Sequence, residues 1–81
     1  MNDLQKYITA FVETFEVEES DLIDLSYQDI PAWDSLGHMT LMAELEDVFD
    51  VELDIDDIID FSSFEVGKNI LKKYNVEVEQ S

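Results

Sequence analysis

Acidic side chains outnumber basic side chains by 21 to 4 in this chain of 81 residues, which gives a formal net charge of −17. Oppositely charged pairs are therefore scarce, and the packing of apolar side chains must hold the fold together. Apolar residues make up 46% of the sequence and aromatic residues 11%, enough for the core of a globular domain. The length predicts one domain with one modest core.

The negative charge also limits the partners of this protein. Its long-range field repels phosphate, which excludes DNA, RNA and anionic membranes as direct partners and favours a basic protein surface or a cation. The chain has no cysteine, so it has no disulfide, zinc–thiolate site or thiol nucleophile. It has no apolar run near the roughly 18 residues of a membrane span, and residues 1–15 lack the features of a signal peptide. We therefore expect a cytoplasmic monomer without membrane insertion.

Helical patterning dominates the sequence and predicts an all-α fold. Apolar residues of the first segment recur at helical spacing: Leu4, Tyr7, Ile8, Phe11, Val12 and Phe15. Asp3 precedes them as an N-cap or a first-turn acid. Further helices are expected over 35–49 with Ser35 as N-cap, over 56–60 and over 63–74. We predict a small antiparallel bundle of three to four helices. One domain is expected over 1–75, followed by a flexible C-terminal tail over 76–81.

Residues 16–34 form a long loop between the first two predicted helices. Pro31, the only proline, prevents a regular helix through this stretch, although Ser20 can begin a short helical turn. We expect an ordered connection that is held on the core by its apolar residues, Leu22, Leu25, Ile30 and Trp33. Loops of this length are uncommon and often carry function.

The helix predicted over 35–49 has two apolar faces. The core face comprises Leu41, Met42, Leu45, Val48 and Phe49. On nearly the opposite side lie Leu36, Met39 and Ala43, flanked by Thr40, Glu46 and Asp47. Residues 34–60 contain ten acidic residues and no lysine or arginine. An apolar stripe with an acidic rim is typical of a docking surface for a basic partner. Alternatively, one or two of these residues are covered by the long loop.

The motif Trp33-Asp34-Ser35-Leu36 resembles the signature of the acyl carrier protein family, in which Asp-Ser-Leu begins the second helix. Other positions fit the family's second, third and fourth helices: Leu41, Leu45, Glu46, Phe49, Asp50, Ile58, Phe61 and Phe64. The segment 50–53 is similar to the turn after the second helix. The match runs without a gap from about residue 33 to residue 72, whereas the first helix and the loop fit in length and pattern only.

The resemblance implies a carrier without catalytic activity of its own. Ser35 would hold a 4′-phosphopantetheine arm, transferred from coenzyme A by a phosphopantetheinyl transferase, and the thiol of the arm would carry acyl groups as thioesters. A helix N-terminus favours a phosphodiester. Partner enzymes would dock on Asp34, Leu36, Met39, Thr40, Ala43, Glu46 and Asp47. The candidate lining of an acyl pocket is Met42, Leu45, Leu53, Ile58 and Phe61, which can equally be plain core residues.

Departures from the family pattern favour a specialised carrier over a general fatty-acid carrier, and we expect it to be a discrete protein. Gly37 replaces a common acid, Thr40 replaces another, and Phe61 and Phe64 are bulkier than the usual aliphatic residues. An aminoacyl or peptidyl carrier, and an acidic helical docking module without a prosthetic group, remain alternatives.

Two other kinds of site fit the sequence poorly. A serine hydrolase site is disfavoured because Ser35 and His38, three residues apart on one helix, do not provide its geometry. The acidic run 50–56 lacks the glycine and the glutamate of an EF-hand, since Ile55 and Phe61 occupy those positions, and we predict no specific metal site.

Overall fold

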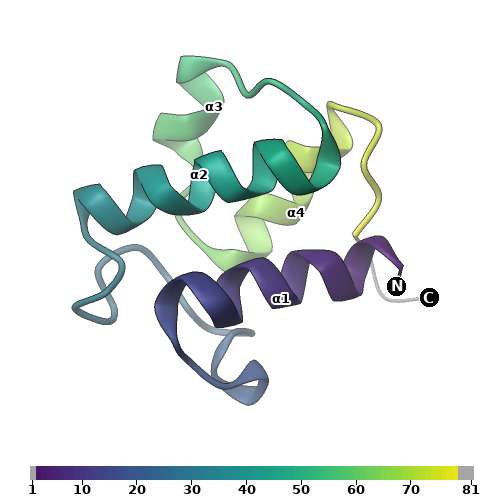
Figure 1. The fold of residues 1–81 in the computed structure, drawn as a ribbon. Helices are drawn as coiled ribbons and strands as arrows, with labels where there is room; N and C mark the ends of the chain where they lie inside the picture. Colours follow the sequence, from purple (N-terminus) through teal and green to yellow (C-terminus); the bar gives the residue numbers. More distant parts are fainter. Residues whose placement is uncertain (1, 79–81) are drawn as a thin grey trace.

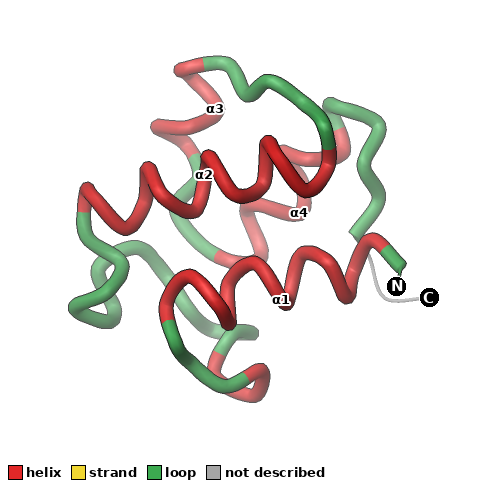
Figure 2. The backbone as a smooth tube through the Cα atoms, in the orientation of Figure 1, coloured by secondary structure: helices red, strands yellow, loops and turns green. Residues whose placement is uncertain are grey.

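The computed structural model describes residues 2–78 of the chain (Figure 1). Its α-helices are α1 (Asp3–Phe15), α2 (Ser35–Phe49), α3 (Ile55–Asp60) and α4 (Phe64–Lys72), and a short 3-10 helix, η1 (Glu19–Asp21), follows α1. The described range contains no strand, and loops connect the helices (Figure 2). The prediction of an all-α fold is confirmed.

The helix ends follow local capping rules. α1 begins after Asn2, whose side chain accepts a hydrogen bond from the backbone N–H of Gln5 at 2.8 Å, so Asp3 is a first-turn acid and not the N-cap. The C-cap of α1 is Glu16 and that of α2 is Asp50, and both adopt the left-handed conformation, with φ of 56° and 55°. Ser63 caps α4 by accepting a hydrogen bond from the backbone N–H of Val66.

The core combines aliphatic side chains with a group of aromatic rings that contact one another between the helices. α1 and α2 pack side by side and run in opposite directions (Figure 1). The ring of Phe11 on α1 lies 5.5 Å from that of Trp33 and 5.0 Å from that of Phe64 on α4. The buried hydroxyl of Tyr7 donates to the carbonyl oxygen of Phe64 at 2.6 Å, and burial raises the pKa of Tyr7. A Cβ on Gly67 would meet the Tyr7 hydroxyl and the Phe61 ring at 2.2 Å, so α4 approaches α1 closely.

The long loop packs on this core through its apolar residues. Leu22, Leu25 and Trp33 are buried, and Ile30 packs against them. The backbone N–H of Tyr27 donates to Ser62 at 2.9 Å, and the carbonyl oxygen of Leu25 accepts from Phe64 at 3.0 Å. These bonds fasten the loop to the segment that begins α4.

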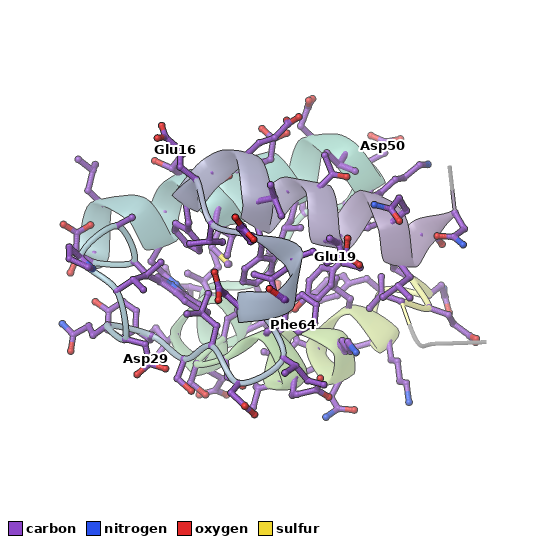
Figure 3. All side chains as sticks on the ribbon, turned by 90° about the horizontal axis from the view of Figure 1, so that it is seen from below. Glu16, Glu19, Asp29, Asp50 and Phe64 are labelled. Atoms are coloured by element: carbon purple, nitrogen blue, oxygen red, sulfur yellow. The ribbon has the colours of Figure 1, made fainter. Side chains whose placement is uncertain are left out.

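Acidic side chains lie mostly on the outside of the molecule. Figure 3 shows Glu16, Glu19, Asp29 and Asp50 at its surface, whereas Phe64 lies between α1 and α4. This distribution keeps the negative charges in water, where their mutual repulsion is weakest.

Among the acidic residues that the structure describes, Asp57 on α3 is the exception, because it is buried at 7% exposure. It pairs with Lys73 at 2.5 Å and accepts a hydrogen bond from the hydroxyl of Tyr74. The bond from Lys73, and then that from Tyr74, hold the pKa of the Asp57 carboxyl below its usual range. The contact ties α3 to the end of α4.

The packed chain continues beyond the predicted domain end at residue 75. Val76 and Val78 are both buried in the core, at 6% and 0% exposure. Helical periodicity does not predict this packing, because the two valines stand in an irregular segment after α4. The rest of the predicted tail, residues 79–81, lies outside the described residues.

Candidate functional site

Ser35 is the first residue of α2 and is exposed. The prediction that Ser35 caps this helix is wrong, because Asp34 is the N-cap and its carboxylate accepts a hydrogen bond from the backbone N–H of Gly37 at 2.8 Å. Both residue types are good caps, and the extended backbone at Asp34 decides between them. The hydroxyl of Ser35 is therefore not used to stabilise the helix end.

The hydroxyl of Ser35 instead lies beside a tyrosine of the long loop. The Tyr27 hydroxyl and the Ser35 Oγ are 3.1 Å apart, and either group can donate the hydrogen bond. Tyr27 is not among the residues that the sequence predicts for the site. Its position eight residues before Ser35, in an irregular loop, carries no pattern that would reveal the contact.

Gly37 allows the loop to approach the first turn of α2. A Cβ at this position would lie 1.9 Å from the backbone carbonyl oxygen of Ala32, far inside van der Waals contact. The close approach fixes how the end of the loop enters the helix, and so how Ser35 is presented. The close approach also gives a physical reason for glycine at this position, where the acyl carrier proteins that the motif resembles usually have an acid.

We expect the substitution Gly37→Ala to lower the free energy of unfolding by about 1–2 kcal/mol. The clash with a backbone atom outweighs the gain of about 1 kcal/mol in helix propensity. Thr40→Ala, at an exposed position of the same helix, is the control and should change stability by less than about 0.5 kcal/mol. Equilibrium unfolding in urea measures both variants. Equal stability of the two would contradict the close approach at Gly37.

His38 lies under the long loop and is half-buried. Its Nδ1 accepts a hydrogen bond from Trp33 Nε1 at 3.0 Å, so its Nε2 carries the proton and donates to the carbonyl oxygen of Ile58 at 2.7 Å. Both ring nitrogens are therefore engaged away from Ser35. This arrangement does not suit a general base for Ser35, and it places α3 beside the first turn of α2.

The second apolar face of α2 is exposed, as predicted. Leu36 is 77% exposed and Met39 is 51% exposed. Ala43 also faces solvent, as do Thr40 and Asp47 beside it. The long loop does not cover this apolar stripe of α2, which was the alternative interpretation.

Glu46 on α2 and two isoleucines on α3 differ from what the sequence predicts for the docking surface. Glu46 is only half-exposed, and its carboxylate accepts a hydrogen bond from the backbone N–H of Leu53 at 2.8 Å, so it also holds the turn after α2. On α3, Ile55 and Ile59 are 68% and 72% exposed. Neither isoleucine was predicted to be exposed, because α3 is too short for its faces to be assigned by periodicity.

The predicted acyl-pocket residues lie together in the core. Met42, Leu45, Leu53 and Phe61 are buried, and Ile58 packs against the same core cluster. Two surface pockets have other linings. One lies beside α1, η1 and α4, with Leu4, Leu22 and Phe64 among its residues, and the other lies between α1 and α2. None of the five predicted residues lines either pocket.

Residues 2–78 hold neither a metal-binding group of side chains nor a membrane-spanning helix. That range contains no group of three or more histidine or acidic side chains arranged to hold a metal ion. None of its helices has the length and apolar character needed to cross a membrane.

Comparison with known proteins found no match. No family model matches the chain, and searches of curated proteins and of solved structures found no match either. The function is therefore inferred from the residues around Ser35 and from the resemblance of the motif that contains it.

Proposed function

We propose that this chain is a carrier protein that holds acyl groups as thioesters on a 4′-phosphopantetheine arm attached to Ser35. The observation that carries the proposal is an exposed serine hydroxyl at the first residue of α2, not consumed in capping and next to an exposed apolar face. The Asp-Ser-Leu motif at the same point supports it. The arm supplies the thiol that this cysteine-free chain lacks.

The attachment step requires a nucleophilic serine that a transferase can reach. Ser35 Oγ forms a bond to the phosphorus that bears the pantetheine of coenzyme A, and the bond from that phosphorus to the bridging oxygen of the nucleotide breaks. Adenosine 3′,5′-bisphosphate leaves, and the Ser35 proton passes to a base. Because both nitrogens of His38 are engaged elsewhere, the transferase supplies that base.

The surface around Ser35 fits a basic partner with an apolar patch. Leu36 and Met39 supply apolar contact, and Asp34 and Asp47 supply negative charge at its rim. The same face would serve the transferase and then the enzymes that load and remove the cargo. No lysine or arginine lies between Lys6 and Lys68, so this region attracts cations and basic surfaces.

The proposal also includes the arrangement, the assembly and the pathway of the carrier. We propose an antiparallel helical bundle that is monomeric and serves a specialised biosynthetic pathway. The cargo is an acyl group, with an aminoacyl or peptidyl group as the alternative. The packed core around Met42 and Phe61 would have to open to shelter a long acyl chain, which favours a short or polar cargo.

The test is the intact mass of the folded protein before and after incubation with coenzyme A and a broad-specificity phosphopantetheinyl transferase. We expect the mass to rise by one phosphopantetheine, unless the protein already carries it from the expression host, which the starting mass reveals. An unmodified and folded sample that gains nothing would contradict the proposal. That result would instead favour an acidic docking module without a prosthetic group.

A further inference from the structure

The ring of Tyr27 packs against two aromatic side chains near Ser35. The ring centroid lies 5.3 Å from that of His38 and 6.3 Å from that of Trp33, with edge-to-face geometry in both contacts. His38 and Trp33 are themselves hydrogen-bonded to each other. The tyrosine ring is therefore held by two aromatic neighbours: His38 in the first turn of α2, and Trp33 just before that helix.

The backbone of Tyr27 is fixed as well. Its N–H donates to the carbonyl oxygen of Ser62 at 2.9 Å, and the N–H of the next residue, Gln28, donates to Trp33 at 3.0 Å. Gln28 has a left-handed φ of 71°, which turns the loop back toward α2. With ring and backbone both held, the Tyr27 hydroxyl has a set position 3.1 Å from Ser35 Oγ.

We propose that Tyr27 is a positioning residue for Ser35, a role that rests on the proposed carrier function. In the unmodified protein its hydroxyl holds the Ser35 Oγ in one orientation for the incoming phosphorus. After transfer, Ser35 Oγ has no hydrogen, so the Tyr27 hydroxyl becomes the donor, either to that oxygen or to an adjacent phosphate oxygen. A neutral donor suits a phosphodiester in a region where the neighbouring charge, on Asp34, is negative.

The substitution Tyr27→Phe keeps the ring and removes only the hydroxyl. With the transferase and coenzyme A, we expect kcat to fall about fivefold at saturating carrier, the rate equivalent of one ordinary hydrogen bond. KM should stay unchanged, because the apolar face of α2 is intact. In the protein carrying the arm, the phosphorus-31 resonance of the phosphodiester should shift between wild type and variant, since its hydroxyl donor is gone.

Tyr74→Phe is the matched control, because it removes a hydroxyl that binds Asp57 at the α3–α4 contact. It should lower stability and leave both kcat and the phosphorus resonance unchanged. A loss of kcat in Tyr74→Phe equal to that in Tyr27→Phe would overturn the positioning role, since the effect would then follow stability.

Two further results separate the proposals. If the wild-type protein accepts the arm, but Tyr27→Phe gives the same kcat and the same phosphorus resonance as wild type, the positioning role alone is overturned. A wild-type protein that accepts no arm overturns the carrier function, and the positioning role with it.

Discussion

Replacing Ser35 with alanine is expected to abolish the gain of phosphopantetheine completely while leaving the fold intact. The substitution removes the hydroxyl oxygen that would form the bond to the incoming phosphorus. Because Asp34 caps α2, the variant should keep its free energy of unfolding within about 0.5 kcal/mol of wild type. Intact mass after incubation with coenzyme A and transferase, together with urea unfolding, measures both effects.

Asp34 provides the comparison that shows which residue caps the helix. Asp34→Ala should cost about 1 kcal/mol of stability, and Asp34→Asn should cost much less because asparagine also caps well. A larger loss of stability in Ser35→Ala than in Asp34→Ala would contradict the capping seen in the structure. A Ser35→Ala protein that still acquires the group would show that Ser35 is not the attachment site.

Leu36→Ala is expected to lower the kcat/KM of the transferase for this carrier roughly 30-fold. Leu36 is 77% exposed and directly follows the attachment serine, so it would lie near the centre of any interface that reaches Ser35. A residue that anchors the centre of an interface as a hot spot costs about 2 kcal/mol or more when truncated, which corresponds to that factor. Steady-state kinetics with varied carrier concentration measures the change. The high exposure means that the fold should lose little stability.

Ile23→Ala is the matched control for this prediction. Ile23 is 65% exposed, similar to Leu36, but it lies on the long loop beside the pocket lined by Leu4 and Phe64. The same truncation there should leave kcat/KM unchanged. Equal losses in the two variants would indicate that general surface hydrophobicity, and not the face of α2, governs recognition.

The parts of the fold that depend on local periodicity could be predicted from the sequence. The apolar spacing in α1 and the two faces of α2 describe which side chains are buried and which are exposed, and the structure agrees. The isolated apolar residues of the loop also predicted its packing on the core, because a large apolar side chain such as Trp33 in an acidic stretch is favoured in the core; Trp33 is buried.

The remaining features depend on contacts between distant segments. The approach of Ala32 to Gly37, the hydroxyl of Tyr27 beside Ser35, and the burial of Val78 all require knowledge of the path of the backbone. Neither the residue types nor their spacing in the sequence predicts these contacts. The choice of Asp34 over Ser35 as the cap is similarly a matter of backbone conformation at one residue, since both side chains are suitable.

The most direct test of the central claim is to locate the acquired group within the wild-type chain. After reaction with coenzyme A and transferase, the protein is cleaved and its peptides are fragmented in a mass spectrometer, which distinguishes Ser35 from the five other serines. We predict that all of the phosphopantetheine is on Ser35, at the first residue of α2. Its presence on another serine, or its absence from a folded protein, would contradict the account.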